Sequence, residues 1–421
     1  MKLYFETYGC TSNRADTEIM EGLVEDSHEI VGRPEDCDVA VINSCGVIDG
    51  TTRKVMRRVR EMKGAGKRVV LAGCLPRIDP DSLQDCRPDF VMGPDSIGSI
   101  GDVLGSLEDG NDGGSVQTLK VTGFDKAAAR RRPDGSVIRA IPIAEGCLGG
   151  CSYCGTRFAR GRLHSYAPES IEAGVRSALS WGCREIQLTA QDTGAYGADI
   201  GTDLAELINR VCMVEGDFRI RVGMMNPAHL MGFLDDLIEA FANEKVYKFL
   251  HLPVQSGDDR VLQDMRRGYG VEEFTEIVQR FRKAHPGLTL STDVIIGYPT
   301  EDEEAFERTY RLIERIGPDI LNITRFSPRP GTPAAGLRDM PDRIKKERSR
   351  RMSILAREVS SQINRGYVGR EEQVLVTEYG KKGTLLARTH SYKQVVLREG
   401  VPGEFRRVRI KDSTAHYLVA G

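Results

Sequence analysis

The chain has 421 residues, of which 40% are hydrophobic, and this predicts two or three globular domains. No window approaches the roughly 18 apolar residues of a membrane span, and the start of the chain lacks the basic stretch and apolar core of a signal peptide. We therefore expect a cytoplasmic protein with no membrane partner. The net charge is −2, but residues 341–421 carry 18 basic and nine acidic residues, a bias that favours a polyanionic partner such as RNA.

Residues 1–108 alternate short apolar runs with helical patterns. Strands are predicted for KLYFETY, DVAVINS and KRVVLAG, and a helix follows each of the first two. This alternation indicates a parallel α/β sheet, whose ligands gather at the carboxyl ends of the strands. Residues 109–136 are rich in glycine and charge, so we predict a linker or an exposed loop there.

Residues 137–340 repeat the strand–helix alternation. Strands are predicted for VIRAIPI, EIQLT, FRIRVG, YKFLHL, LTLSTDVII and ILNIT. These units are too few for a closed eight-stranded barrel, so we expect an open, partial barrel. Residues 341–364 are predicted to form a connecting amphipathic helix. Residues 365–421 contain five short strand patterns separated by glycine turns, which predict a small β-barrel of a kind that often binds nucleic acid.

Ten cysteines in a cytosolic chain favour metal binding or redox chemistry over disulfides. Cys147, Cys151 and Cys154 follow a predicted strand in the segment GCLGGCSYC. Three thiolates on a tight loop can hold three irons of a [4Fe–4S] cluster and leave the fourth iron open to chelate S-adenosylmethionine (SAM). One electron from the cluster would then release a 5′-deoxyadenosyl radical. The alternatives are a zinc site, which usually has four ligands in paired motifs, and buried structural cysteines.

Three further cysteines lie at predicted strand ends, namely Cys10, Cys45 and Cys74. In a parallel sheet these positions converge on one edge, where they could hold a second cluster with one open iron. Buried cysteines near strand ends are also common, so both interpretations stay open at this point. The remaining cysteines lack such spacing and are predicted to be structural: Cys37, Cys86, Cys183 and Cys212.

Essentially the whole chain resembles the methylthiotransferase family of radical SAM enzymes. The segments YGCTSNRAD, INSCGV and AGCLPR are similar to the cysteine motifs of the family's flavodoxin-like N-terminal domain. The segment VPGEFRRVRI is similar to a TRAM domain, a small OB-like RNA-binding barrel. The segments GCLGGCSYCGTRFARGRLHSY and LTAQDTGAYG most resemble the archaeal and eukaryotic branch. That branch adds a methylthio group to C2 of N6-threonylcarbamoyladenosine, next to the anticodon of tRNA.

The resemblance implies two [4Fe–4S] clusters. One would be held by Cys10, Cys45 and Cys74, and the other, the catalytic one, by Cys147, Cys151 and Cys154. The resemblance also implies that one SAM donates a methyl group, that a second SAM is the radical source, and that the enzyme needs an electron donor protein and a sulfur donor. The domain boundaries that we predict are 1–108, 137–340 for the radical SAM core, and 365–421 for the TRAM domain.

Strand ends are expected to supply the contacts to SAM. Gln191 would bind its amino group, Arg221 would pair with its carboxylate through a bidentate fork, and Gln255 would contact the ribose or the substrate. Tyr153, between two cluster ligands, would pack on the adenine. The remaining cofactor-binding candidates are Arg160, His251 and Asp293, and ordinary packing or capping is the alternative for each of these residues.

Basic residues alternate along one C-terminal strand. Arg407, Arg409 and Lys411 fall on one face, with Val408 and Ile410 pointing to the core, so this face is predicted to bind RNA phosphates. Two other functions compete with the main interpretation. One is a methylthiotransferase for isopentenyladenosine in tRNA or for a ribosomal protein aspartate. The other is a non-catalytic iron–sulfur protein that binds RNA.

Overall fold

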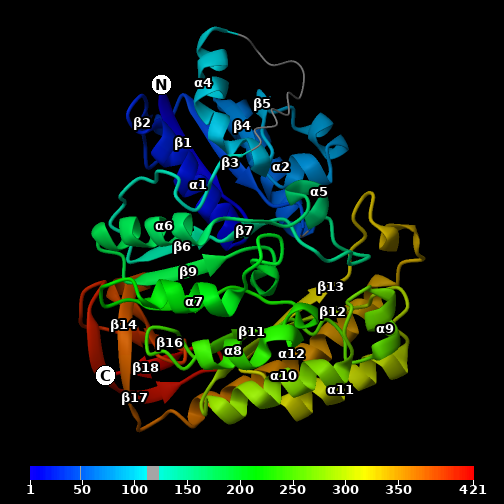
Figure 1. Ribbon diagram of the computed structural model, residues 1–421. Coiled ribbons are helices and arrows are strands. Elements are labelled where there is room, and N and C mark those ends of the chain that lie inside the picture. The colour runs from blue at the N-terminus through cyan, green and yellow to red at the C-terminus, as the bar shows by residue number, and fades with distance from the viewer. Residues whose placement is uncertain (48, 111–122) are drawn as a thin grey trace.

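The computed structural model describes residues 1–47, 49–110 and 123–421. An N-terminal α/β unit, a central half-open barrel and a small closed β-barrel follow one another along the chain (Figure 1). Within the described residues, no helix combines the length and the apolar character needed to cross a membrane.

The N-terminal unit contains a parallel sheet of strand order β2-β1-β3-β4-β5. All six residues of β3 are buried, because helices cover both faces of the sheet. The helices α1 and α4 pack on one face and α2 on the other. The elements are β1 (Lys2–Thr7), α1 (Thr11–Val24), β2 (Glu29–Ile30), β3 (Val39–Ser44), α2 (Asp49–Gly64), β4 (Arg68–Gly73), α3 (Leu75–Ile78), β5 (Phe90–Val91) and α4 (Ile100–Glu108).

The central unit contains six longer parallel strands, as predicted. They form two sheets, β10-β9-β6 and β11-β12-β13, which meet through a parallel bridge between Ile220 and Val246. The outer strands β6 and β13 do not pair with each other in the described structure, so the barrel is open there and much of β13 is exposed. The strands are β6 (Ile138–Pro142), β9 (Glu185–Thr189), β10 (Arg219–Val222), β11 (Phe249–His251), β12 (Thr289–Ile296) and β13 (Ile320–Arg325).

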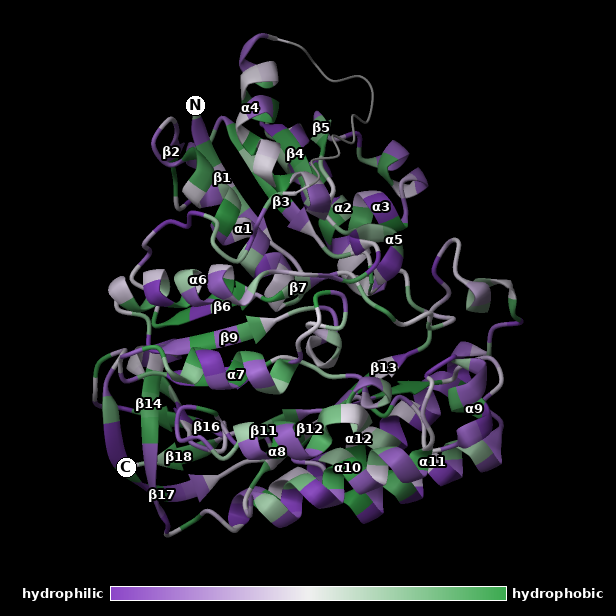
Figure 2. Cartoon of the chain, viewed as in Figure 1, coloured by the Kyte–Doolittle hydropathy of each residue, from purple (hydrophilic) through white to green (hydrophobic). Residues whose placement is uncertain are grey.

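Amphipathic helices cover the outside of this partial barrel. In Figure 2 the helices α7, α10 and α11 carry both hydrophobic and hydrophilic residues, and their apolar side chains join the largest core of the protein. The remaining elements of the unit are β7 (Ala144–Glu145), α5 (Thr156–Arg160), β8 (His164–Ser165), α6 (Pro168–Ser180), α7 (Leu204–Cys212), α8 (Leu234–Ala240), α9 (Asp259–Asp264), α10 (Val271–Ala284) and α11 (Glu303–Ile316).

The long helix α12 (Asp342–Arg365) leads to a closed barrel of strand order β14-β15-β16-β18-β17. Closure removes the exposed sheet edges that an open five-stranded sheet would have. The five strands were all predicted from the sequence, and they are β14 (Glu371–Tyr379), β15 (Leu385–Thr389), β16 (Gln394–Leu397), β17 (Phe405–Ser413) and β18 (Leu418–Ala420).

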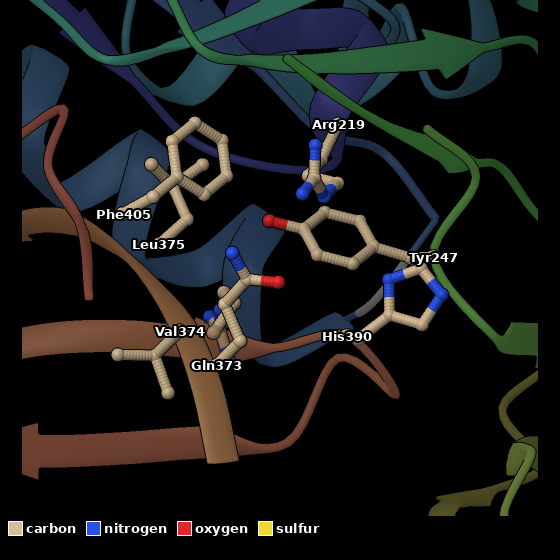
Figure 3. A pocket seen from close by; sticks show the side chains of 8 residues that line it. Arg219, Tyr247, Gln373, Val374, Leu375, His390 and Phe405 are labelled. Carbon is tan, nitrogen blue, oxygen red and sulfur yellow. The ribbon is translucent and has the colours of Figure 1, made fainter. Parts of the chain in front are cut away.

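The closed barrel docks on the amino ends of the central strands. Figure 3 shows Arg219 and Tyr247 of the central unit facing residues of the barrel such as Phe405. The Arg219 guanidinium lies 4.5 Å from the centre of the Phe405 ring. Tyr392, between β15 and β16, donates a hydrogen bond to Oε1 of Glu185 at 3.1 Å. The carboxyl ends of the central strands, where ligands bind in such folds, therefore stay clear of this barrel.

Lys393 ties the barrel to the central unit, and its loss is expected to be strongly destabilising. Its Nζ lies 2.6 Å from Oδ1 of Asp319, and both side chains are at most 7% exposed. We expect Lys393→Met to lower the free energy of unfolding by about 3–5 kcal/mol, because the Asp319 carboxylate would lose its ion-pair partner in a buried site. Urea unfolding measures the loss, and Lys382→Met on the exposed surface is the control that should change little.

The predicted linker lies partly outside the described residues, at 111–122. Residues 123–136 contain no helix or strand, but Lys126 and Arg131 are buried rather than exposed. The ammonium group of Lys126 lies 2.9 Å from Oδ1 of Asp16 and 2.6 Å from Oε1 of Glu145. This segment therefore takes part in the packing between the N-terminal and central units.

Candidate active site

The loop between β7 and α5 carries Cys147, Cys151 and Cys154, which we call the central cysteine loop. It is held by Ser152, whose hydroxyl donates to the carbonyl of Asp264 at 2.8 Å and whose N–H donates to the carbonyl of Met265 at 3.1 Å. The three thiols form no disulfide. They lie at the carboxyl end of the partial barrel, which is where such folds bind their ligands.

A cavity of about 340 Å³ opens beside this loop. Its volume lies at the lower end of the usual range for small-molecule sites. Val47, two residues after Cys45, contributes to the wall, so the cavity lies between the N-terminal and central units. The other residues used below that line it are Cys147, Cys151, Tyr153, Cys154, Gln191, Asp192, Asn226, Gln255 and Arg267.

Arg267 is the main charged contact of the central cysteine loop. Its Nη1 donates to the Cys151 sulfur at 3.2 Å and to the Tyr153 hydroxyl at 3.3 Å, and its Nη2 donates to Oδ1 of Asn226 at 3.0 Å. Burial raises the pKa of Cys147 to about 11, so iron would have to displace a proton there. A fixed guanidinium beside three thiolates offsets part of their charge, and the donor set therefore fits an iron–sulfur cluster.

The second group of thiols, Cys10, Cys45 and Cys74, is called the N-terminal cysteine set. These residues directly follow or closely follow the adjacent strands β1, β3 and β4. The Cys10 and Cys74 thiols both point to Oδ1 of Asn13, at 3.5 and 3.9 Å. Burial raises the pKa of Cys74 to about 11. The strand ends thus bring together three cysteines that are far apart in sequence.

Glycines next to the cysteines allow the strand ends to come this close. Gly9 has φ +133°, and a Cβ built there would lie 3.0 Å from the Cβ of Cys45. Gly73 has φ +98°, and a Cβ there would lie 2.4 Å from the carbonyl oxygen of Ser44. Only glycine avoids both the backbone strain and the clash. These glycines therefore allow the backbone to approach a ligand closely at this edge of the sheet.

Among the described residues, no three His, Cys, Asp or Glu side chains surround a point where one metal ion would sit. A [4Fe–4S] cluster makes a different demand, because each thiolate binds a separate iron. The donors here are thiolates in threes, which differs from the paired motifs of structural zinc sites. The chemistry of both cysteine groups therefore favours a cluster over a single ion.

Three of the predicted cofactor residues line the cavity, namely Tyr153, Gln191 and Gln255. Gln191 is already engaged, since its Oε1 accepts from the Gly146 N–H at 2.7 Å and its Nε2 donates to the Ser12 hydroxyl at 3.3 Å. Gln255 is 9% exposed and has φ +68°, an unusual conformation for a residue other than glycine. Such backbone strain is concentrated at functional sites.

Arg221 does not line this cavity, in contrast to the expectation that it pairs with the SAM carboxylate there. Its guanidinium lies 5.3 Å from the ring centre of Phe249 and 5.9 Å from that of Tyr392. The physical reason is its place in β10, a strand that continues to Val222. Its side chain therefore lies below the strand ends, at the level reached by the docked barrel.

His251 and Asp293 also lie outside the cavity wall, on the neighbouring strands β11 and β12. Nε2 of His251 is 3.2 Å from Oδ1 of Asp293, and Nδ2 of Asn322 donates to the same oxygen at 2.6 Å. Nδ1 of His251 is buried and has no hydrogen-bond partner among the described residues. The two residues thus form a polar group of their own inside the partial barrel.

Arg160, a cofactor-binding candidate from the sequence, is buried and does not line the cavity. Its guanidinium pairs with Asp16 and Glu145, both at 2.6 Å. Since Asp16 belongs to α1, this contact joins the central unit to the N-terminal unit.

Two residues of the site were not singled out in the sequence. Arg267 follows α9 and carries no recognisable spacing, so only its place in the segment MRRGY could have pointed to it. Asp192 follows Gln191 directly and is 1% exposed. Its Oδ1 accepts from the Asn226 N–H at 2.9 Å and its Oδ2 lies 2.7 Å from Nδ1 of His229, so Asp192 orients the wall of the cavity.

The other cysteines are buried within the cores of the protein, in line with their predicted structural role. Cys183 is 0% exposed and its thiol donates to the carbonyl of Ser136 at 3.1 Å. Burial raises the pKa of Cys212 to about 11.

Three family models match the chain. Residues 141–313 match the radical SAM superfamily, residues 2–93 match the uncharacterized protein family UPF0004, and residues 365–420 match the TRAM domain. Among similar proteins, the probable threonylcarbamoyladenosine tRNA methylthiotransferase of Pyrococcus horikoshii is 49% identical, with 100% of this chain and 99% of that protein covered. The threonylcarbamoyladenosine tRNA methylthiotransferase of Drosophila melanogaster is 37% identical, with 99% and 77% covered.

Solved structures support the fold alone. The radical S-adenosylmethionine methyltransferase TsrM of Kitasatospora setae, determined with cobalamin and a [4Fe–4S] cluster, has a TM-score of 0.60 at 12% identity and covers 81% of this chain and 79% of its own. The cobalamin-dependent radical enzyme OxsB has a TM-score of 0.55 at 10% identity, with 86% and 56% covered.

Proposed function

Because the chain belongs to the threonylcarbamoyladenosine tRNA methylthiotransferase family, we infer that it is a radical SAM enzyme that adds a methylthio group to C2 of N6-threonylcarbamoyladenosine in tRNA. The observation that carries this function is the shared cavity. The central cysteine loop contributes to its wall, and so does Val47 of the N-terminal unit, just beyond Cys45. A tRNA base in this cavity would meet radical chemistry and sulfur chemistry together.

Cys147, Cys151 and Cys154 would hold the [4Fe–4S] cluster of the radical reaction. When bound, this cluster supplies the electron that splits SAM. Arg267 offsets the charge of the thiolates through its contact with Cys151. Gln255, strained and facing the cavity, would orient the cofactor or the target nucleoside. Apolar side chains in the wall, among them Phe158, Met224 and Met225, would shield a reactive radical from side reactions.

The N-terminal cysteine set would hold a second cluster, with which the transferred sulfur is associated. Its support is the convergence of Cys10 and Cys74 on Asn13 and the close approach of Gly9 to Cys45. One SAM would methylate this sulfur and another would supply the radical. The reaction also needs an electron donor protein and a sulfur donor, and we place it in the cytoplasm.

The C-terminal barrel would bind the tRNA near its anticodon loop. Arg407, Arg409 and Lys411 are exposed on one face of β17, while Val408 and Ile410 pack toward the barrel core. Replacing the three basic residues by glutamine is expected to weaken tRNA binding at every sequence, because phosphates carry no base identity. The slope of log K against log salt should fall by about 1 for each phosphate interaction that the substitutions remove.

Filter binding at several salt concentrations measures this slope. Gln substitution of Lys381 and Lys382, which are exposed outside β17, is the matched control and should leave the slope in place. An unchanged slope in the β17 variant would show that tRNA does not bind to this face of β17.

Mass spectrometry of tRNA nucleosides, from cells with and without the gene, tests the function itself. We expect 2-methylthio-N6-threonylcarbamoyladenosine to disappear and its unmethylthiolated precursor to accumulate. If that nucleoside is unchanged while the isopentenyladenosine product disappears, the substrate assignment is wrong. If the reduced protein releases no 5′-deoxyadenosine from SAM, a non-catalytic iron–sulfur protein that binds RNA becomes the better interpretation.

A further inference from the structure

We propose that Arg160 is a positioning residue that fixes the N-terminal cysteine set against the central cysteine loop and raises the reduction potential of the cluster held by that set. The inference rests on the second cluster of the proposed function. Arg160 lies at the end of α5, the helix that begins two residues after Cys154. It therefore belongs to the radical unit by sequence but reaches the other cysteines in space.

The guanidinium of Arg160 is almost completely buried between the two units. Its side chain is 2% exposed, and its nitrogens lie 2.6 Å from Oδ2 of Asp16 and 2.6 Å from Oε1 of Glu145. Lys126 contacts the same two carboxylates. Two cations and two carboxylates thus form a closed network. Through Asp16, this network holds the Arg160 side chain against α1 of the N-terminal unit.

Asn13 transmits this contact to the thiols. Nη2 of Arg160 donates to Oδ1 of Asn13 at 3.2 Å, and the same oxygen receives the Cys10 and Cys74 thiols. Nδ2 of Asn13 donates to the carbonyl of Ser44, next to Cys45, at 2.9 Å. The positive charge of Arg160 also acts on Cys74 directly, since it opposes the rise in the pKa of that thiol that burial causes. Asn13, which Arg160 contacts, therefore lies next to all three cysteines or their neighbours in the chain.

Helix packing supports the same connection. The helix α3 begins directly after Cys74, and its Ile78 packs with Ala159 of α5. Gly155, directly after Cys154, is so close to Ile78 that an added Cβ would lie 3.1 Å from the Ile78 Cγ2. A short helix therefore follows Cys74 and another follows Cys154, and these two helices pack on each other.

A buried positive charge beside a cluster ligand favours the reduced, more negative state of that cluster. Hydrogen bonds to the sulfurs and net charge are among the factors that set the potentials of iron–sulfur clusters. Removing the guanidinium should make reduction about tenfold less favourable, which is a fall of about 59 mV for a one-electron couple. Loss of the network should also make the distance between the two clusters more variable.

The test uses the full chain with Cys147, Cys151 and Cys154 replaced by alanine, so that only the N-terminal set can hold iron. Redox titration followed by electron paramagnetic resonance is made in this background with Arg160→Gln, Arg160→Lys and Arg162→Gln. Arg162 is exposed just beyond α5 and is the matched control. We expect the potential to fall in Arg160→Gln, to fall less in Arg160→Lys, which keeps the charge, and to stay in place in Arg162→Gln.

The outcomes separate this inference from the function on which it rests. If the background protein with Arg160 intact binds no iron after reconstitution, the second cluster itself is wrong. If it binds about four irons but the potential and the resonance are the same in Arg160→Gln and Arg162→Gln, the role of Arg160 is overturned. If Arg160→Gln does not fold, two other variants replace it in the test. One is Arg160→Lys, and the other is the double variant Asp16→Asn/Arg160→Gln, in which the ion pair is neutral. An unchanged potential in both variants would overturn the role of Arg160.

In the enzyme with both sets of cysteines, Arg160→Lys gives a second readout. We expect SAM cleavage to continue while methylthiolation falls more than tenfold, and pulsed resonance to show a broader distribution of distances between the clusters. Equal loss of both activities with an unchanged distance distribution would contradict a positioning role.

Discussion

Cys151→Ala is expected to abolish 5′-deoxyadenosine release and tRNA methylthiolation together. Cys151 is one of only three thiols in the central cysteine loop, and it is the one that Arg267 contacts at 3.2 Å. A [4Fe–4S] cluster with an open iron already uses the minimum of three protein ligands, so losing one leaves too few. We expect both products to drop to background, measured by chromatography and mass spectrometry after reduction under anaerobic conditions.

The control for this prediction is Cys212→Ala. Cys212 is buried at the end of α7 and lies outside the cavity. Its loss removes a small apolar group from the core and should lower stability modestly, while SAM cleavage continues. Release of 5′-deoxyadenosine by Cys151→Ala within tenfold of the native rate would rule out the cluster that we assign to this loop.

The architecture could be predicted from the sequence because buried parallel strands leave a strong pattern. In β3 every residue is buried, and the segment VAVINS opens with four apolar residues in a row. In β12 six of the eight residues are buried, and the segment TLSTDVII ends in the apolar run Val294–Ile296. Short edge elements lack that pattern. The strands β2, β5, β7 and β8 each have two residues, too few for any periodicity to appear, and none of them was predicted.

The cysteines of the site could be predicted, but the surroundings of the arginines could not. The place of each cysteine in the fold follows from the strand that precedes it, and that strand can be recognised from a few neighbouring residues. Arg160 instead meets Asp16, 144 positions away, and Arg221 lies beside Tyr392 of the docked barrel. Both contacts depend on how separate units pack. No spacing in the sequence encodes that packing, so the sequence alone predicts contacts with the cofactor for Arg160 and Arg221.

Cys10→Ala is expected to separate the two halves of the reaction, with SAM cleavage retained and methylthiolation lost. Cys10 is exposed and its side chain does not cap α1, so the change should cost little stability. Without Cys10 the N-terminal set keeps only two thiols, too few for a cluster that has three protein ligands. Iron should fall from about eight to about four per chain, and 5′-deoxyadenosine should still form.

Cys37→Ala is the matched control, because Cys37 is a buried cysteine of the same unit that belongs to a different apolar cluster. It should keep the full iron content and methylthiolation. A Cys10→Ala protein that still methylthiolates tRNA would show that sulfur reaches the nucleoside without the N-terminal set. Loss of 5′-deoxyadenosine as well would mean that the two cysteine groups depend on each other, since Asn13 connects Cys10 to Arg160 of the radical unit.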